Sequence, residues 1–401
     1  MENDNLGRGQ VLFMALSTGL IVANIYYCQP LVVLISKDFG VPESNAGIVT
    51  FFTQVGYALG LLFFVPLGDM FEKRKQIIVT TALTVASLVM AALSNSLAML
   101  SIASLLIGST SVVPQLILPL AAHLSPPQKR GKIIGIVMSG LLIGILLSRT
   151  ISGFIGAWLG WRGMFWIAAA ISAIIMVVMR LIFPKTPSQY KGNYGALMKS
   201  LFTLIKKEPI LREASAINAL TFASFGLFWT TMVLHLAGDP FHFHSDRIGL
   251  FGLAAVAGAL IAPLIGGTAD KGNPRIAIGY GLLTVFISFV LFYFLGNYIL
   301  GMIAGIILLD LGQQSVHVSN QARVYALQPE ARNRLNTVYM TASFIGTSLG
   351  SAIGLYIWSR WAWPGICIAG FVFISSAFAV YGLTYKHINK AAALKEYPDI
   401  D

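Results

Sequence analysis

Charged residues are scarce in this sequence, and acidic residues are the scarcer kind. Only 11% of the 401 residues are charged, with 16 acidic against 27 basic side chains. Soluble proteins carry about 25% charged residues, so a water-soluble globular fold is disfavoured for most of the chain. The hydrophobic share is 56%, and most of the surface must therefore face something other than water.

Cysteine pairs, phosphate-binding loops and catalytic constellations are also lacking. The two cysteines, Cys28 and Cys367, lie in separate apolar segments, which predicts neither a disulfide nor a metal pair. No glycine-rich loop is followed by Lys and Ser or Thr, so ATP-driven transport is disfavoured. No nucleophile stands near a plausible base. We therefore expect no enzyme, no cofactor and no bound metal.

The chain does contain apolar runs of about 20 residues, the length that crosses a bilayer. A net charge of +11 is compatible with nucleic-acid binding only if the basic residues form one patch, and here they form short clusters between the runs. We expect an all-α membrane protein that binds no nucleic acid. Twelve transmembrane helices are predicted, at 11–36, 45–67, 76–94, 97–122, 132–157, 162–183, 212–237, 246–268, 275–295, 298–322, 335–358 and 363–385.

The Lys and Arg residues fall mostly on one side of these spans. The other side has one positive charge per loop, at Lys37, Arg162, Arg247 and Arg360. Positively charged loops stay cytoplasmic, so both termini are predicted to be cytoplasmic. The N-terminus shows no cleavage signature, and long tails are lacking, which favours a multi-pass protein of a bacterial inner membrane.

An acidic-then-basic loop after the second span has a second copy in the other half of the chain. The first copy runs from Pro66 to Lys75 around Asp69, and the second from Gly266 to Arg275 around Asp270. Gly144 is echoed by Gly346 at the same offset of about 200 positions, which marks an internal duplication.

The first loop resembles the loop between the second and third helices of the major facilitator superfamily. That pattern is glycine, any residue, leucine, glycine or alanine, aspartate, arginine, any residue, glycine and then basic residues. Val65, Met70 and Glu72 depart from it. The residues that fit it are Leu67, Gly68, Asp69, Lys73, Arg74 and Lys75.

The resemblance implies the major facilitator fold, with two pseudo-symmetric six-helix bundles at 1–183 and 209–401. A basic linker at 184–208 would join them, and its leucines recur at helical spacing, which is typical either of a helix on an anionic membrane surface or of a plain tether.

The resemblance also implies a cytoplasmic gate held closed by Asp69 near Arg130. The predicted gating residues are Asp69, Lys73, Arg74, Arg130, Asp270, Arg275 and Arg332.

The fifth span carries a glycine series with the spacing found in proton-driven drug antiporters of this superfamily. In that motif a Gly-Pro pair falls where Ser148-Arg149 stands and a Gly-Gly pair where Ser152-Gly153 stands. The spacing favours an exporter, whereas the charge of Arg149 departs from the motif. Arg149 is expected either to bind an anionic group on the substrate, to pair with Asp310, or to serve packing alone.

The tenth span is the richest in polar residues, with Asp310, Gln313, Gln314 and His317 on one helical stripe. An ionised Asp at mid-bilayer costs about 2.5 to 3.5 kcal/mol on insertion scales, so the stripe must face a cavity or partners. We interpret Asp310 as the proton-coupling group, with His317 as a relay for its proton. A permanently paired structural acid and a satisfied histidine are the alternatives.

In this superfamily the first, fourth, seventh and tenth helices line the central cavity. Their amides and aromatic rings suit an amphipathic organic molecule better than a bare ion, although ordinary packing explains aromatic rings equally well. The predicted substrate-binding residues are Asn24, Tyr27, Gln54, Gln115, Arg149, Asn218, Phe222, Phe225, Trp229, Gln313 and Gln314.

Together these features predict a proton-coupled secondary transporter that exports a small drug or metabolite by alternating access and works as a monomer. One alternative is a proton-coupled uptake symporter for a small organic anion. A membrane sensor with a transporter fold is another, but the chain has no sizeable polar domain to relay a signal.

Overall fold

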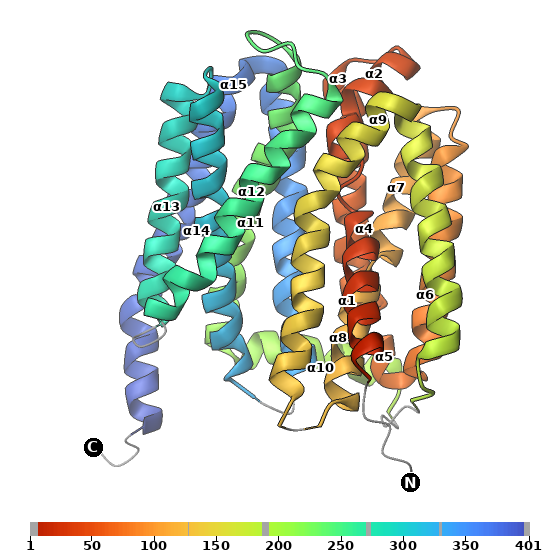
Figure 1. The fold of residues 1–401 in the computed structure, drawn as a ribbon. Coiled ribbons are helices and arrows are strands. Elements are labelled where there is room, and N and C mark those ends of the chain that lie inside the picture. The colour runs from red at the N-terminus through yellow and green to blue at the C-terminus, as the bar shows by residue number, and fades with distance from the viewer. Residues whose placement is uncertain (1–6, 127, 187–191, 270–273, 329–330, 397–401) are drawn as a thin grey trace. The chain divides into compact units, whose positions relative to one another are not determined.

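The computed structural model describes residues 7–126, 128–186, 192–269, 274–328 and 331–396, and the secondary structure in these ranges is helical throughout (Figure 1). The longer α-helices are α1 (Arg8–Ala23), α4 (Ile48–Phe63), α6 (Lys73–Ala92), α7 (Leu97–Thr110), α8 (Val113–Leu124), α9 (Arg130–Ile182), α10 (Tyr194–Lys207), α11 (Pro209–Ala237), α12 (Ser245–Ala269), α13 (Pro274–Leu295), α14 (Ile299–Tyr325) and α15 (Arg332–Glu396). Shorter elements are η1 (Gln29–Leu31), α2 (Val32–Phe39), α3 (Glu43–Ala46) and α5 (Leu67–Met70).

The fold is all-helical with twelve helices, and eight helices in the described ranges are long and apolar enough to cross a membrane. Two of the long elements each contain two spans. The backbone of α9 turns at Gly160, with φ 71°, and that of α15 turns at Ala362, with φ 46°. Gly160 and Ala362 have the spacing of the internal repeat, so both halves reverse direction at the same place, although only the first has the glycine that a positive φ favours.

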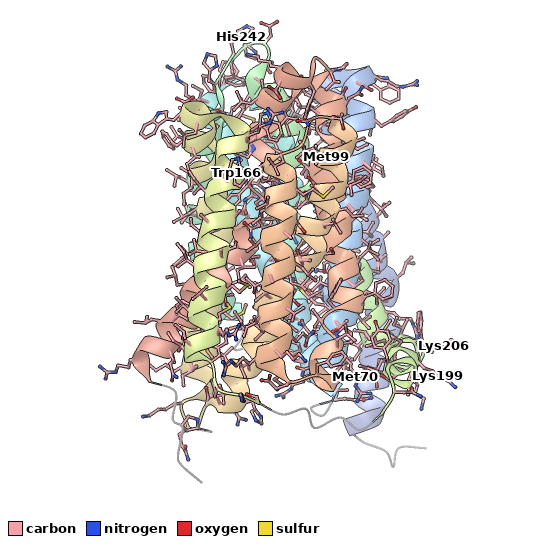
Figure 2. The ribbon with its side chains drawn as sticks, turned by 90° about the vertical axis from the view of Figure 1, so that its right-hand side faces the viewer. Met70, Met99, Trp166, Lys199, Lys206 and His242 are labelled. Carbon is pink, nitrogen blue, oxygen red and sulfur yellow. The ribbon has the colours of Figure 1, made fainter. Side chains whose placement is uncertain are left out.

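The chain divides into two compact units. The first comprises Met1–Leu197 and Trp229–Val256, and the second comprises Met198–Phe228 and Ala257–Asp401. In the first unit α1 packs against α8 and α9, and α6 lies beside α7 and α9 (Figure 1). Figure 2 shows Met70 and His242 at opposite ends of this unit. In the second unit α13 packs against α14 and α15.

The first predicted span is not one continuous helix. After α1 ends at Ala23, residues 24–28 form turns, and η1 leads into α2. Pro30 has no N–H group and so cannot donate the next helical hydrogen bond. Instead the backbone N–H groups of Gln29 and Leu31 donate to the carbonyl oxygens three residues earlier, those of Tyr26 and Cys28 respectively. The break leaves the Tyr27 carbonyl oxygen without a helical N–H partner, and the Ser152 hydroxyl donates to it instead.

Glycines bring helix backbones into direct contact in both units. A Cβ atom on Gly144 of α9 would lie 2.1 Å from the Gly19 carbonyl oxygen of α1, and one on Gly346 of α15 would lie 2.0 Å from the Ala219 carbonyl oxygen of α11. Small residues are what allow such close approach between transmembrane helices. The internal repeat seen in the sequence therefore corresponds to a repeated helix contact.

A buried group of charges ties four helices of the second unit together. Glu213 of α11 has a side chain only 1% exposed and accepts from Arg275 Nη2 at 2.8 Å and from Arg323 Nη2 at 2.6 Å. Its Oε1 atom also accepts from the Thr384 hydroxyl at 2.6 Å. The Tyr381 carbonyl and ring lie against the Arg275 guanidinium as well. One carboxylate thus serves two guanidinium groups.

The linker forms a helix, α10, whose apolar face is covered by protein. Leu197, Leu201 and Leu204 are buried, and the Tyr194 hydroxyl donates to the Phe63 carbonyl oxygen at 3.1 Å. Arg212 at the start of α11 donates to two carbonyls at the end of α10. The leucine face that suggested contact with the membrane surface is therefore used for packing within the protein.

We expect Gly144→Ala to destabilise the protein, because its new Cβ atom would collide with main-chain atoms of α1. Overpacking of this kind costs about 1 to 3 kcal/mol. The measurement is thermal unfolding of the purified protein in detergent. Gly135→Ala in the same helix is the matched control, since a Cβ atom there meets no other atom within 4 Å. Equal melting temperatures for the two variants would contradict the packing argument.

Glu213→Gln should be far more harmful, because it leaves Arg275 and Arg323 buried without their carboxylate. Breaking a buried ion pair from one side costs about 3 to 5 kcal/mol. Asp38→Asn is the control, since its pair with Arg162 has side chains 40% and 37% exposed, and exposed pairs contribute about 0.2 to 1 kcal/mol. Resistance to denaturant of the two purified variants tests the difference; similar losses would refute it.

Candidate functional site

Arg149 of α9 sits inside the first unit, where it contacts an amide and two aromatic rings. Arg149 is only 3% exposed, and its Nε donates to Gln29 Oε1 at 2.7 Å. Its guanidinium carbon lies 3.9 Å from the centre of the Trp229 ring and 4.8 Å from that of Tyr26. We call these four residues the Arg149 cluster. Cation–π contact with two rings fixes the plane of the guanidinium and partly offsets its loss of hydration.

The broken first span supplies the neighbourhood of this cluster. The Tyr27 carbonyl oxygen, at the break, accepts a hydrogen bond from the Ser152 hydroxyl of α9, one turn from Arg149. Gln29, which binds Arg149, immediately precedes Pro30. The proline that interrupts the helix therefore also sets the position of the amide that holds the arginine.

Asn24 stands at the start of the same break and is 2% exposed. Neither its Oδ1 nor its Nδ2 has a hydrogen-bond partner among the described residues. A buried primary amide without partners is unusual, because each unsatisfied polar group costs about 1 to 3 kcal/mol. A polar group on a bound molecule would satisfy it. This is the behaviour expected of a substrate-binding residue.

The other predicted binding residues of the first unit line its interior. Tyr27 and Gln54 are buried, and Gln115 of α8, which is half-buried, shares a side-chain hydrogen bond with the Tyr57 hydroxyl of α4. Glycine contacts hold α4 against α7 at this level, since a Cβ on Gly56 would meet the Leu105 carbonyl oxygen at 2.0 Å. The amides thus belong to a closely packed wall.

In the second unit the polar stripe of α14 is formed as the sequence predicts. Asp310 is 3% exposed and Gln313 is 4% exposed, while Gln314 and His317 are half-buried. Both amide atoms of Gln313 lack hydrogen-bond partners in the described parts of the chain. A Cβ atom on Gly258 of α12 would lie 3.1 Å from the Asp310 Cβ atom, so this glycine packs directly against Asp310.

His317 is held by a group of residues from α11 and α15, which we call the His317 cluster. Its Nδ1 atom lies 3.3 Å from both Asn218 Nδ2 and the Tyr339 hydroxyl. The Tyr339 ring stacks on the imidazole, and its hydroxyl donates to the His317 carbonyl oxygen at 2.9 Å. Asn218 also donates to the Ser343 hydroxyl. Since Asn218 Nδ2 is a donor, the geometry favours Nδ1 as the acceptor nitrogen of a neutral imidazole.

Aromatic residues cover the other side of this cluster. The Phe222 ring meets His317 at 5.5 Å edge-on, and contacts Phe225 and Phe344 at 6.2 and 6.1 Å. Phe222 and Phe225 are only half-buried. Trp229, which was predicted with them, belongs instead to the Arg149 cluster. The predicted binding residues therefore fall into two groups, one in each unit.

The predicted gating residues have varied surroundings. Arg275 is buried on Glu213, as described above, and Arg332 is exposed with its Nε donating to the Tyr325 carbonyl oxygen at 3.2 Å. Arg74 donates to the Arg180 carbonyl oxygen, whereas Lys73 and Arg130 begin α6 and α9. Asp270 lies outside the described residues, and of Asp69 only its place in α5 is described.

Several important residues were not in the predicted set. No sequence pattern singles out Tyr339, Ser343 or Arg323, since each is an ordinary residue near a helix end or in an apolar span. Glu213 was overlooked because it falls at the edge of its predicted span. Gln29 carried a usable signal, namely an amide directly before a proline inside an apolar run.

Known proteins with similar sequences are transporters. The sequence profile of the Major Facilitator Superfamily matches residues 14–236 and 214–397. The uncharacterized transporter YgaY of Escherichia coli O157:H7 is 43% identical over 368 residues, which cover 92% of this chain and 93% of that protein. A "probable transporter" of Streptomyces coelicolor is 30% identical, with 94% and 87% covered.

More distant similarities extend to a named substrate class and to solved structures. A "probable sugar efflux transporter" of Helicobacter pylori is 23% identical, with 80% of this chain and 81% of that protein covered. The inward-facing crystal structure of a bacterial homologue of the human lysosomal transporter Spinster superposes with a TM-score of 0.74 at 17% identity, covering 96% of this chain and 98% of the other. A peptide transporter of the POT type gives 0.73 at 14% identity, with 92% and 93% covered.

These matches agree with the duplicated loops in the sequence and with the all-helical fold. The chain belongs to the Major Facilitator Superfamily and is a multi-pass secondary transporter, not an enzyme.

Proposed function

We propose that this protein is a proton-coupled exporter of a small organic molecule that works by alternating access. The observation that carries the proposal is Asp310, a carboxyl group 3% exposed on a membrane-spanning helix. An ionised carboxylate is costly at such a place and a protonated one much less so. Taking up or releasing a proton there changes the relative energies of two conformations, and coupling requires such a change.

The binding residues support an uncharged or amphipathic organic substrate. Asn24 and Gln313 each present a buried amide whose polar atoms lack partners in the described structure. Phe222 and Phe225 add half-buried rings. Substrate pockets combine apolar walls with a few polar groups that fix orientation. Hydroxyl or carbonyl groups on the substrate would supply what both amides lack.

Export rather than uptake is supported by two features. The fifth span has the glycine spacing of proton-driven antiporters, with Gly144 and Gly153 in place and Ser152 standing for a glycine. The Helicobacter pylori relative is named as a probable sugar efflux transporter.

We propose that both termini are cytoplasmic, because the loops richest in Lys and Arg lie on the same side of the membrane as the termini.

The carboxyl group is tested by Asp310→Asn in proteoliposomes with an imposed pH gradient. Transport driven by the gradient should fall to background, whereas exchange of labelled substrate across the membrane without a gradient should persist, since exchange moves no net protons. A panel of sugars, lipophilic cations and organic acids identifies the substrate. Asp246→Asn, at the first turn of α12, removes an acid elsewhere and should behave as the unmodified protein. Gradient-driven transport by Asp310→Asn would exclude Asp310 as the coupling group.

A second function, uptake of a small organic anion together with protons, is favoured by the Arg149 cluster. A guanidinium 3% exposed, oriented by Gln29, Tyr26 and Trp229, is suited to bind a carboxylate. Uptake predicts substrate accumulation when the outside is acidic, whereas export predicts depletion. The direction of substrate flux relative to protons therefore separates the two functions.

If the substrate is an anion bound by Arg149, Arg149→Gln should raise its KM about ten- to a hundredfold, the effect of losing a charged hydrogen bond. The KM of an uncharged analogue should change little. Arg247→Gln serves as the control because it removes an exposed arginine of the same unit. Equal changes for the charged and the uncharged compound would rule out a charge-recognition role.

A further inference from the structure

An apolar groove lies on the surface of the second unit, between the two arms of α15. It encloses about 620 Å³ and has no polar residue in its lining. Its lining follows each arm for about 12 Å, from Ile353 to Trp361 and from Pro364 to Val372, at 1.5 Å per residue. That is most of the depth of one leaflet, which is about half of the 30 Å hydrocarbon core. Its main lining residues are Ile353, Ile357, Trp361, Gly365, Ile368 and Val372.

The groove exists because the chain reverses at Ala362 and because Gly365, three residues later, has no side chain. A Cβ atom on Gly365 would lie 2.6 Å from the Trp361 Cβ and 2.9 Å from the Ile357 Cγ2. The two arms therefore meet at a glycine, and the space above it stays open. Ile368 and Val372 on its wall are 54% and 60% exposed, so the groove opens towards the surrounding lipid.

A positive charge stands at the end of the groove. Arg360 is exposed and immediately precedes Trp361, and its guanidinium carbon lies 4.8 Å from the centre of the Tyr356 ring. No acidic group lies within 4.0 Å of Arg360 in the described ranges. Tyr356 and Trp361 are 55% and 58% exposed, and such aromatic residues mark the level of lipid headgroups.

The equivalent turn in the first half of the chain is built differently. Trp158 stands where the repeat places Arg360, and the nearby arginine, Arg162, is paired with Asp38 at 2.6 Å. That arginine also donates to the Ser94 carbonyl oxygen. The charge at the first turn is thus used within the protein, whereas that of Arg360 faces outward.

We propose that this groove is a binding site for an acidic phospholipid, with one acyl chain lying along the groove and the phosphate held by Arg360. A planar guanidinium matches phosphate oxygens well. The match in depth to a single leaflet, the apolar lining and a cation at headgroup level all fit this one kind of ligand. The site is independent of the transported substrate.

Native mass spectrometry of the delipidated full-length protein, titrated with phosphatidylglycerol or phosphatidylcholine of the same acyl chains, tests the proposal. Phosphatidylglycerol should bind more tightly, and Arg360→Gln should weaken its binding about fivefold, the effect of one basic residue near an anionic membrane. Arg360→Lys should retain most of the affinity. Arg247→Gln, which removes another exposed arginine, should leave the affinity unchanged; an equal loss there would overturn the proposal as unspecific attraction.

The acyl-chain part is tested separately by Ala369→Phe, which fills the groove from its wall. It should weaken retention of both phospholipids, and its melting temperature without lipid reports whether the fold is intact. If Ala369→Phe binds phosphatidylglycerol as before, the groove is not the lipid site. If groove variants instead abolish a dimer seen in the unmodified protein, the groove is an interface between two copies, and the lipid proposal fails.

Discussion

An ionised side chain inside an apolar helix bundle needs partners, and this requirement shapes both units of the protein. Water is absent from the hydrocarbon core, so each buried charge must be met by other side chains or by aromatic faces. Arg149 uses one amide and two rings. Glu213 uses two arginines and a threonine. Each solution draws its partners from several helices, and thereby fixes how those helices pack.

The two buried groups differ in what they are suited to do. The Glu213 carboxylate is saturated, since its two oxygens accept hydrogen bonds from two cations and a hydroxyl. Such an arrangement is stable and has little reason to change. The Arg149 guanidinium is oriented by the Gln29 amide and by the rings of Trp229 and Tyr26, contacts that fix the plane in which it could receive an anion. The first is a structural tie, and the second is a recognition site in our proposal.

The internal repeat provides the frame, and departures from it mark the specialised places. Gly144 and Gly346 make equivalent helix contacts in the two units, and Gly160 and Ala362 turn the chain at equivalent positions. The residue 202 positions after Arg149 is Ser351, so Arg149 has no basic counterpart in the second half. Conversely, Arg360 corresponds to Trp158 of the first half. A duplicated fold can keep its packing in both halves while each half carries different chemistry.

The sequence by itself determined the class of fold, the number of spans, the repeat and the polar stripe around Asp310. These follow from local composition and periodicity, because a bilayer demands long apolar helices with satisfied backbones. Only the tertiary structure decided that Gln29 and Trp229 surround Arg149, that Tyr339 stacks on His317, and that Glu213 joins two arginines. Those partners lie about 80 to 120 residues apart or come from different helices, and sequence periodicity carries no information about which helices become neighbours.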